Sequence, residues 1–322
     1  MISNRMILAI LCVLLLAGCG VIYLFDNDDY NVEFESSADT VEYRLKGFMP
    51  CDYTCRVYSN TDVPERMYFY RDDSYTHFYD NTSQATFFNN MERVLKARNY
   101  DSIEYVDANQ LKSLIDNPSK APGSMIMIVS GSMPDTIIED GISTLFTKWM
   151  YNDGTVFWAG PEIGRYVSHI DDYTESETGR PFIGHVCDGT DEQDIESISE
   201  LGLVSGFSLK NCIQYGLEND YPGSVCLSTC SSDYSSASVV KYSNGRIYMV
   251  GGKLVDSVLP THTALAEVLI CGINEDTSVK SSESFSKMYG DVSGSVNVSS
   301  GDVLILTIGK PYSSWARCYI VP

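Results

Sequence analysis

The chain has 322 residues, with 22 Lys and Arg against 43 Asp and Glu, so its formal net charge is −21. This acidity argues against nucleic acid as a partner, because a phosphate-binding face is built from clustered Lys and Arg. A hydrophobic fraction of 44% and a charged fraction of 20% are ordinary for a folded protein, which excludes wholesale disorder. The length fits one large domain or two small ones.

The N-terminus predicts a membrane anchor. Residues 6–25 carry no charge, with Arg5 before them and acidic residues directly after them. At about 1.5 Å per residue a helix of this length spans roughly 30 Å, the thickness of a bilayer core. An alternative is a lipoprotein signal cleaved before Cys19, which would then be lipidated. Both interpretations place residues 26–322 outside the cytoplasm, on the surface of the cell membrane.

Cysteine usage agrees with export. Eight of the ten cysteines lie beyond the anchor, an even number that favours disulfides in an exported chain. Cys51 with Cys55, and Cys226 with Cys230, are close enough in sequence to form local loops. A zinc site is the alternative, but the usual two-residue spacing is missing.

Two other patterns concern modification and cofactors. Asn81-Thr82-Ser83 and Asn297-Val298-Ser299 are glycosylation sequons. The glycine-rich phosphate-binding patterns are absent, as is any metal-binding histidine pair. We therefore expect no nucleotide, no metal and no other cofactor.

Strand and helix patterns alternate after a tether and loop at residues 26–63. In the segment 87–98 apolar residues recur at helical spacing, whereas 125–129 is a continuous apolar run typical of a strand buried on both faces. Helices are predicted at 87–98, 108–115, 142–150 and 264–271, and strands at 66–70, 103–106, 125–129, 155–159, 239–242, 247–250, 303–308 and 316–321.

This order predicts the fold class and the domains. Repeated strand–helix–strand units favour an α/β fold with a mostly parallel sheet flanked by helices. Residues 168–236 interrupt the rhythm with an acidic, serine-rich and cysteine-containing stretch, which we interpret as a disulfide-rich insertion. The expected organisation is an anchor at 1–25, the tether at 26–63, and an α/β ectodomain at 64–322 that ends in a pair of strands.

The succession of elements resembles a known family. The stretches MIMIVSGSMPDTI, STLFTKWMYNDG, TVFWAGPEIGRYV, NGRIYMVGGKLVD and ALAEVLICGI are similar to the class I glutamine amidotransferase-like, flavodoxin-like α/β fold. Catalytic members carry a Cys at the centre of a G-x-C-x-G turn after a strand. Here the matching stretch runs from Gly160 to Gly164 and has Glu162 at that position. The resemblance therefore implies a domain that lacks the nucleophile for glutamine hydrolysis.

Ligands of open parallel sheets bind beyond the carboxyl ends of the strands. Charged and small polar side chains follow three of the predicted strands, and the acidity favours a ligand that is cationic, hydroxyl-rich or bridged by a metal ion. The candidate ligand-binding residues are Arg71, Asp72, Asp73, Ser130, Gly131, Ser132, Glu162 and Arg165.

Three functions remain open from the sequence. The first is a membrane-anchored, non-catalytic module that binds a cell-envelope glycan or a protein partner. Aromatic residues between Tyr68 and Phe88 offer stacking faces for sugar rings, although such residues more often fill a core.

The second is a hydrolase of cell-envelope polymers that uses Asp72, Asp73 and Glu162 as acid and base. His185 and Cys187 add the minimum for a thiol hydrolase. The third is a structural protein of the envelope.

Overall fold

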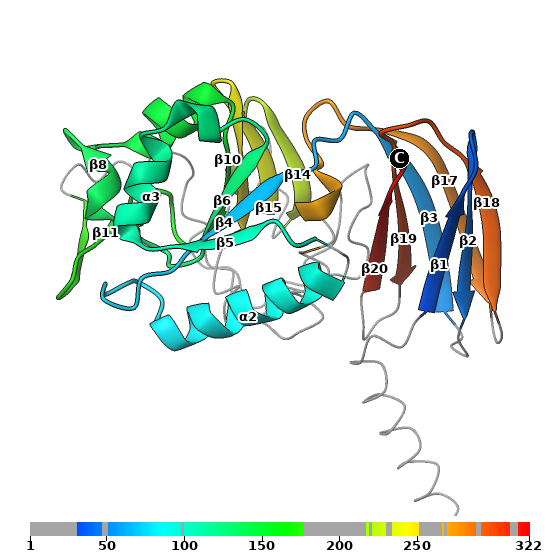
Figure 1. Ribbon diagram of the computed structural model, residues 1–322, viewed down its shortest axis with the longest axis horizontal. Coiled ribbons are helices and arrows are strands. Elements are labelled where there is room, and N and C mark those ends of the chain that lie inside the picture. The colour runs from blue at the N-terminus through cyan, green and yellow to red at the C-terminus, as the bar shows by residue number, and fades with distance from the viewer. Residues whose placement is uncertain are drawn as a thin grey trace, which may run out of the picture.

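The computed structural model describes ten segments of the chain. They are residues 31–46, 51–97, 100–176, 217–218, 221–229, 234–250, 266, 269–287, 291–309 and 315–322. These segments build two parts that lie side by side, an α/β part and a β-sandwich (Figure 1).

The centre of the α/β part is one large sheet. Five of its strands run parallel in the order β5-β4-β6-β10-β16, and β15 with its neighbours continues the sheet antiparallel. The strands are β4 (Arg66–Tyr70), β5 (Ile103–Val106), β6 (Ser124–Ile128), β10 (Thr155–Ala159), β13 (Leu217–Glu218), β14 (Ser224–Thr229), β15 (Tyr234–Tyr242) and β16 (Gly245–Val250).

Helices cover both faces of this sheet. On one face, α2 (Asn81–Ala97) buries Phe87 and Met91 against β4 and β6, and the Asp80 carboxylate caps its first turn by accepting from the Ser83 backbone N–H at 2.9 Å. The other face carries α3 (Ala108–Ile115) and a chain of short turns. These are η1 (Pro118–Lys120), η2 (Asp135–Ile137), the π-helical η3 (Leu145–Trp149) and η4 (Met150–Asn152).

Short strands extend this part at the ends of β6 and β10. A three-stranded sheet combines β7 (Met133–Pro134), β11 (Tyr166–Ser168) and β12 (Tyr173–Glu175). A small hairpin pairs β8 (Ile138–Glu139) with β9 (Ile142–Ser143). The predicted helix at 142–150 therefore starts later, at Leu145, because Asp140 and Gly141 adopt positive φ angles and turn the chain into the hairpin.

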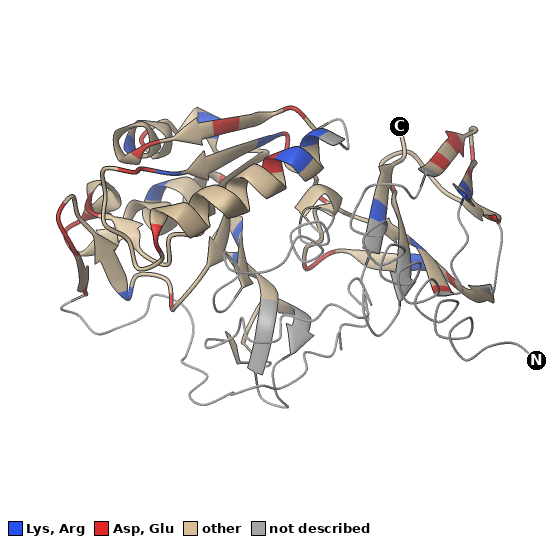
Figure 2. Cartoon of the chain, turned by 90° about the horizontal axis from the view of Figure 1, so that it is seen from below, with Lys and Arg blue, Asp and Glu red and all other residues tan. Residues whose placement is uncertain are grey.

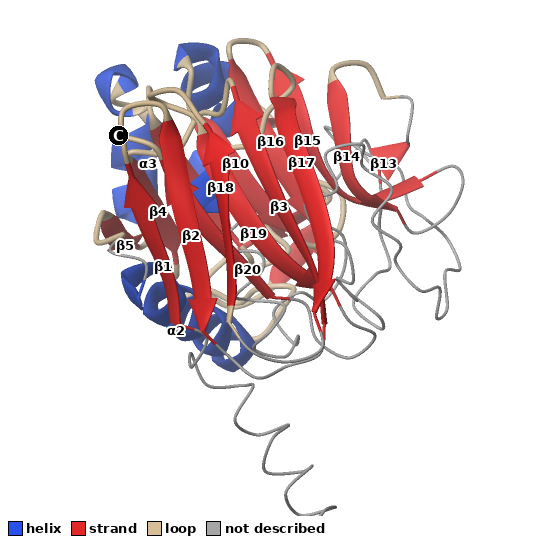
Figure 3. Ribbon diagram, turned by 90° about the vertical axis from the view of Figure 1, so that its right-hand side faces the viewer, coloured by secondary structure: helices blue, strands red, loops and turns tan. Residues whose placement is uncertain are grey.

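The sandwich is built from strands at the start and at the end of the described chain. One sheet has the order β1-β2-β18 and the other β17-β3-β19-β20, and they stack in front of the large sheet in Figure 3. Its strands are β1 (Asn31–Ser36), β2 (Thr40–Lys46), β3 (Cys51–Ser59), β17 (Ser278–Lys287), β18 (Val292–Asn297), β19 (Val303–Gly309) and β20 (Trp315–Ile320). The predicted closing strand pair is present as the β19–β20 hairpin. Residues predicted to be a tether instead form β1, β2 and β3.

The predicted fold class was wrong for the chain as a whole. Of the fifteen strand pairings in the described segments, ten are antiparallel, and they include every pairing of the sandwich. In the described segments the parallel pairings all lie in the middle of the chain, four of them in the large sheet and one, the short β7–β11 pair, outside it. Most of the predicted insertion lies outside the described residues; its described part supplies the last residue of β11, then β12, β13 and β14, and the start of β15.

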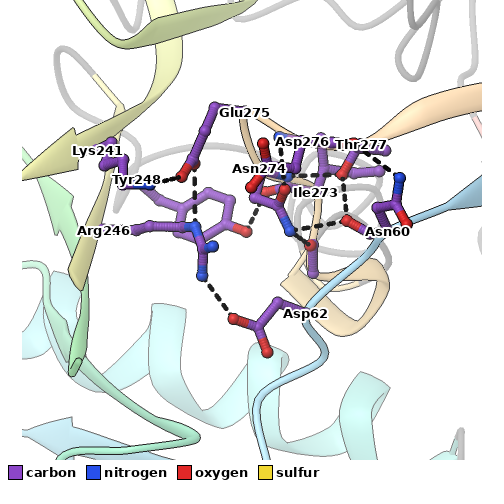
Figure 4. Close-up of polar contacts among 11 residues, drawn as sticks. Asn60, Asp62, Lys241, Arg246, Tyr248, Ile273, Asn274, Glu275, Asp276 and Thr277 are labelled. Atoms are coloured by element: carbon purple, nitrogen blue, oxygen red, sulfur yellow. Dashed lines mark hydrogen bonds and ion pairs between the residues drawn. The ribbon is translucent and has the colours of Figure 1, made fainter. Parts of the chain in front are cut away.

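A polar junction ties the sandwich to the α/β part (Figure 4). Arg246 on β16 binds the Asp62 carboxylate at 2.5 Å and the Glu275 carboxylate at 3.0 Å. Beside this pair, the Asn274 side chain donates to the Asn60 carbonyl oxygen at 3.0 Å. Gly272, with φ +60°, lies so close to Asp62 that a Cβ would overlap its backbone. The chain passes between the two parts after β3 and again before β17, and these contacts hold the two connecting segments together.

The predicted disulfide framework is wrong where the structure tests it. Cys51 and Cys55 lie on the same strand, and four residues of extended chain span about 13 Å, beyond the roughly 7 Å that a disulfide allows between Cα atoms. Cys55 is a buried free thiol, and its burial raises the pKa to about 12, which makes it inert. The side chain of Cys226, and Cys230 altogether, lie outside what is described.

The predicted anchor also lies outside the described residues, together with Cys19. Within the described segments no helix has the length and apolar character needed to span a membrane. Acidic and basic positions occur along the chain in both parts, and several of the acidic ones lie on loops (Figure 2).

Candidate functional site

The loops after β6 and β10 touch each other. Gly160 has a φ of +143°, and a Cβ at this position would lie 2.7 Å from the Gly131 Cα. Gly131 itself has a φ of +69° and is closely covered by the rings of Phe78 and Tyr79. Glycine at both positions therefore lets two strand ends meet beneath aromatic side chains.

Of the charged residues predicted after β4, Arg71 and Asp73 pair with each other, whereas Asp72 binds other groups. Arg71 donates from Nε and Nη2 to both carboxylate oxygens of Asp73, at 3.0 and 2.9 Å. Asp72 accepts from the Ser74 backbone N–H at 3.0 Å and from the Ala108 N–H, in the first turn of α3, at 3.1 Å. Burial alone would raise the pKa of Asp72, but these hydrogen bonds and that from the Ser74 hydroxyl hold it below its usual value. Asp72 is therefore an ionised acceptor at neutral pH.

Glu162 and Arg165, predicted after β10, form a separate pair. The Glu162 side chain is only 4% exposed, and its carboxylate accepts from Arg165 Nη1 at 3.2 Å. Arg165 also binds the exposed Glu175 at 3.2 Å, and its guanidinium lies 5.4 Å from the centre of the Tyr166 ring. Among the described residues Glu162 thus shares no partner with Asp72 or Asp73, and no contact there joins the members of the predicted three-carboxylate site.

Ser132 belongs to a buried hydrogen-bond chain that the sequence did not reveal. The Ser132 hydroxyl lies 2.5 Å from that of Ser168, and Ser168 Oγ lies 2.9 Å from His77 Nδ1. His77 Nε2 contacts the Asp72 carbonyl oxygen at 3.1 Å. Ser130 donates to the Ser132 carbonyl at 2.6 Å, which fixes the turn through Gly131. This chain connects the ends of β4 and β6 to β11.

Three aromatic rings from the same segments form a cluster, which we call the platform: Phe78, Tyr166 and Tyr173. Phe78 and Tyr166 are stacked with ring centres 4.6 Å apart, and Tyr173 meets both rings edge-on at 5.8 Å. Tyr173 is 41% exposed, and the other two rings are half-buried. Most other aromatic residues between Tyr68 and Phe88 fill the two cores, so of that predicted group Phe78 is the one in the platform.

The rim of the platform carries polar and mostly acidic groups. His169 contacts the Asp135 carboxylate at 3.1 Å, and Tyr75 donates to the other Asp135 oxygen at 2.8 Å. Asp171 and Asp172 are exposed on the loop between β11 and β12. In the described part of the chain, no three His, Cys, Asp or Glu side chains gather closely enough to hold a metal ion.

The remaining predicted sites are separate from the platform. Asn297 is exposed at the end of β18, whereas Asn81 is half-buried and donates from Nδ2 to the Asp73 carbonyl at 3.3 Å. The candidate His185 and Cys187 lie outside the described residues.

No family model and no curated protein matches the chain. Among solved structures it is similar to an exo-β-1,4-mannosidase from Opitutaceae bacterium strain TAV5 (13% identity, 67% of this chain, 37% of that chain, TM-score 0.44). It is also similar to a β-galactosidase from Bacillus circulans sp. alkalophilus (10%, 78%, 36%, 0.38) and to a cytoplasmic protein of Salmonella typhimurium (14%, 62%, 96%, 0.36). The chain thus spans little more than a third of each glycosidase.

The resemblance to the amidotransferase-like fold is corrected by these findings. No such family model matches, and the mixed, mostly antiparallel sheets differ from the helix-flanked parallel sheet that the resemblance implied. The turn that suggested it, Gly160 to Gly164, serves another purpose. It brings β10 against Gly131 and buries Glu162 with Arg165.

Proposed function

We propose that the chain is an extracytoplasmic binding module for neutral, hydroxyl-rich ligands, with oligosaccharides as the ligand class. The platform carries this proposal. Tyr173 is 41% exposed, and its ring packs edge-on against two half-buried rings. Flat aromatic faces next to hydrogen-bonding groups match sugars, which have apolar C–H faces and a periphery of hydroxyl groups.

The charges beside the platform favour a neutral ligand over an anionic one. Glu175, Asp171 and Asp172 are exposed there, while the nearby cation, Arg165, is already bound to two carboxylates. Within the described segments, an anionic sugar would meet this field with Arg165 already engaged by two carboxylates.

Acid–base chemistry by the predicted carboxylates has less support. Asp72 has a lowered pKa, so it is a poor proton donor at neutral pH, and Asp73 and Glu162 each hold an arginine. A glycosidase of the two-carboxylate type needs one protonated acid near the scissile bond. We therefore favour binding through the platform over glycoside hydrolysis by these residues.

The test is a calorimetric titration of the full-length protein with neutral oligosaccharides. Tyr173→Ala is expected to weaken binding about tenfold, because the lost aromatic stacking contact contributes about 1.4 kcal/mol. Tyr151→Ala is the matched control, since Tyr151 is 61% exposed on η4 and is not part of the platform. Equal affinity in both variants, or tighter binding of uronate oligomers than of neutral ones, would contradict the proposal.

A further inference from the structure

The hydrogen-bond chain of Ser132, Ser168 and His77 fixes which atom donates and which accepts in each of its hydrogen bonds. The Asp72 carbonyl oxygen can only accept, so His77 Nε2 carries a proton. Burial lowers the pKa of His77, which leaves the imidazole neutral at pH 7 and Nδ1 free to accept. The Ser168 hydroxyl therefore donates to Nδ1. Asp72 and Asp73 are the charged groups that act on His77, and Tyr70 and Tyr75 pack against its ring.

The second serine completes this arrangement. Ser132 Oγ accepts from the Phe78 backbone N–H at 3.1 Å, so its own proton is available for Ser168 Oγ. A serine hydroxyl that donates to a neutral histidine, which is itself oriented by a third group, is the arrangement that activates a nucleophile. Here the orienting group is a backbone carbonyl instead of a carboxylate.

This pair lies close to the platform. Tyr166 and Ser168 are two residues apart on β11, so their side chains share one face at a spacing of about 7 Å. Phe78 follows His77 directly and stacks on Tyr166. An acyl group on a sugar held at the platform would therefore be within one side-chain length of Ser168.

We infer that Ser168 and His77 form a nucleophile–base pair that removes an ester-linked acyl group from the ligand at the platform. The inference rests on the proposed function for its substrate class, an O-acylated oligosaccharide. Ser168 and Ser132 are fully buried, so the inference requires the side chains around them to move aside as the ligand binds.

The reaction balances with water as the co-substrate. Ser168 Oγ bonds to the ester carbonyl carbon while its proton moves to His77 Nδ1, and the bond from that carbon to the sugar oxygen then breaks. The sugar oxygen takes the proton from Nδ1. Water next attacks the acyl-serine and gives a proton to Nδ1, which returns it to Ser168 as the carboxylic acid leaves.

A fluorophosphonate probe tests this pair without the oligosaccharide. We expect the full-length protein at pH 7.5 to gain one phosphonyl group, located on Ser168 by peptide mass spectrometry. His77→Gln should slow labelling at least about 100-fold, the usual contribution of a general base. Labelling should stay constant down to about pH 6.5, the ordinary pKa of histidine, and fall only on the acid side.

Variants separate the two proposals. Tyr166→Ala should lose oligosaccharide binding and yet keep the label on Ser168, because the probe reacts with the Ser168–His77 pair without the oligosaccharide. The exposed Ser113→Ala should keep the label, whereas Ser168→Ala should lose it. Should Ser168→Ala fail to fold, Ser168→Cys keeps the side-chain size and should be alkylated by iodoacetamide. Absence of the label from Ser168, or equal labelling of His77→Gln, would overturn the inference and leave the binding proposal intact.

Discussion

Gly160 shows that a single residue can determine how closely the ends of two neighbouring strands approach each other. Its φ of +143° is strained for any other residue, and a Cβ would lie 2.7 Å from the Gly131 backbone. We expect Gly160→Ala to destabilise the protein by about 3 kcal/mol, because backbone strain and a steric overlap are combined. Urea unfolding followed by circular dichroism measures this change.

The matched control is Gly301→Ala. Gly301 also has a positive φ, +84°, but a Cβ there would have no neighbour within 4 Å. This variant should lose only about 1–2 kcal/mol from the backbone conformation. If both substitutions cost the same, contact between the two loops does not determine the shape of the site.

Sequence identified part of the site at the residue scale. Asp72 and Ser132 were predicted because they follow buried strands, and both lie at the strand ends. His77 and Ser168 were not joined, because 91 residues separate them and neither belongs to a local motif. Tyr173 was missed since the β11–β12 segment lies inside what was interpreted as an insertion. The pairing of β11 with β7, together with the bridge between Thr76 and His169, brings it to the strand ends.

At the scale of elements, α3 depends on its N-terminal cap. The Asp107 carboxylate accepts from the Gln110 N–H at 2.8 Å, while the Gln110 side chain accepts from the Asp107 N–H at 2.9 Å. Asp107→Ala should lower the free energy of unfolding by about 1 kcal/mol. Asp101→Ala, at an exposed position before β5, is the control and should change it by less than about 0.5 kcal/mol. A loss as large in the control would contradict the capping role.

Some elements were missed although their patterns are present. β2 alternates strictly between buried and exposed residues, the signature of a half-buried strand, yet its acidic surroundings suggested a tether. The Asp140-Gly141 pair is a strong hairpin signal, but the helical spacing of the apolar residues after it was given more weight. In contrast, the strands 66–70, 103–106 and 155–159 were predicted with the observed bounds. In 66–70 and 155–159 four consecutive buried residues of mostly apolar character leave little choice.

At the scale of the molecule, the junction in Figure 4 holds the two parts together. Burial would raise the pKa of Glu275, but hydrogen bonds from the backbone, Arg246 and Lys241 lower it below its ordinary value of 4.5. The stabilisation that Glu275 provides is therefore complete well above pH 4.5 and is lost as the pH falls through the lowered pKa.

Glu275→Gln tests this linkage. The variant should lose about 1–3 kcal/mol of unfolding free energy at pH 7, and its difference from the native protein should shrink as the pH falls below 4.5. Glu283→Gln on the exposed face of β17 serves as control. A difference that is independent of pH would show that the carboxylate charge does not stabilise the junction.

The whole architecture was the hardest to predict. The sandwich pairs strands from the start of the chain with strands from its end, for example β2 with β18 and β3 with β17 and β19. Such pairings leave no local signal, since each strand alone is compatible with many partners. The parallel strands follow one another along the chain, so they dominated the sequence-based interpretation and gave a fold class that omits the sandwich.

Binding at the platform is most directly tested by NMR spectroscopy of the tyrosine rings during titration with a neutral oligosaccharide. The ring signals of Tyr166 and Tyr173 should shift with saturation, while that of Tyr151 stays constant. The binding affinity from these shifts should fall about tenfold in a Phe78→Ala variant, which removes the ring stacked on Tyr166. Unchanged signals at Tyr166 and Tyr173 in the presence of saturating ligand, or shifts confined to the sandwich tyrosines, would contradict the account.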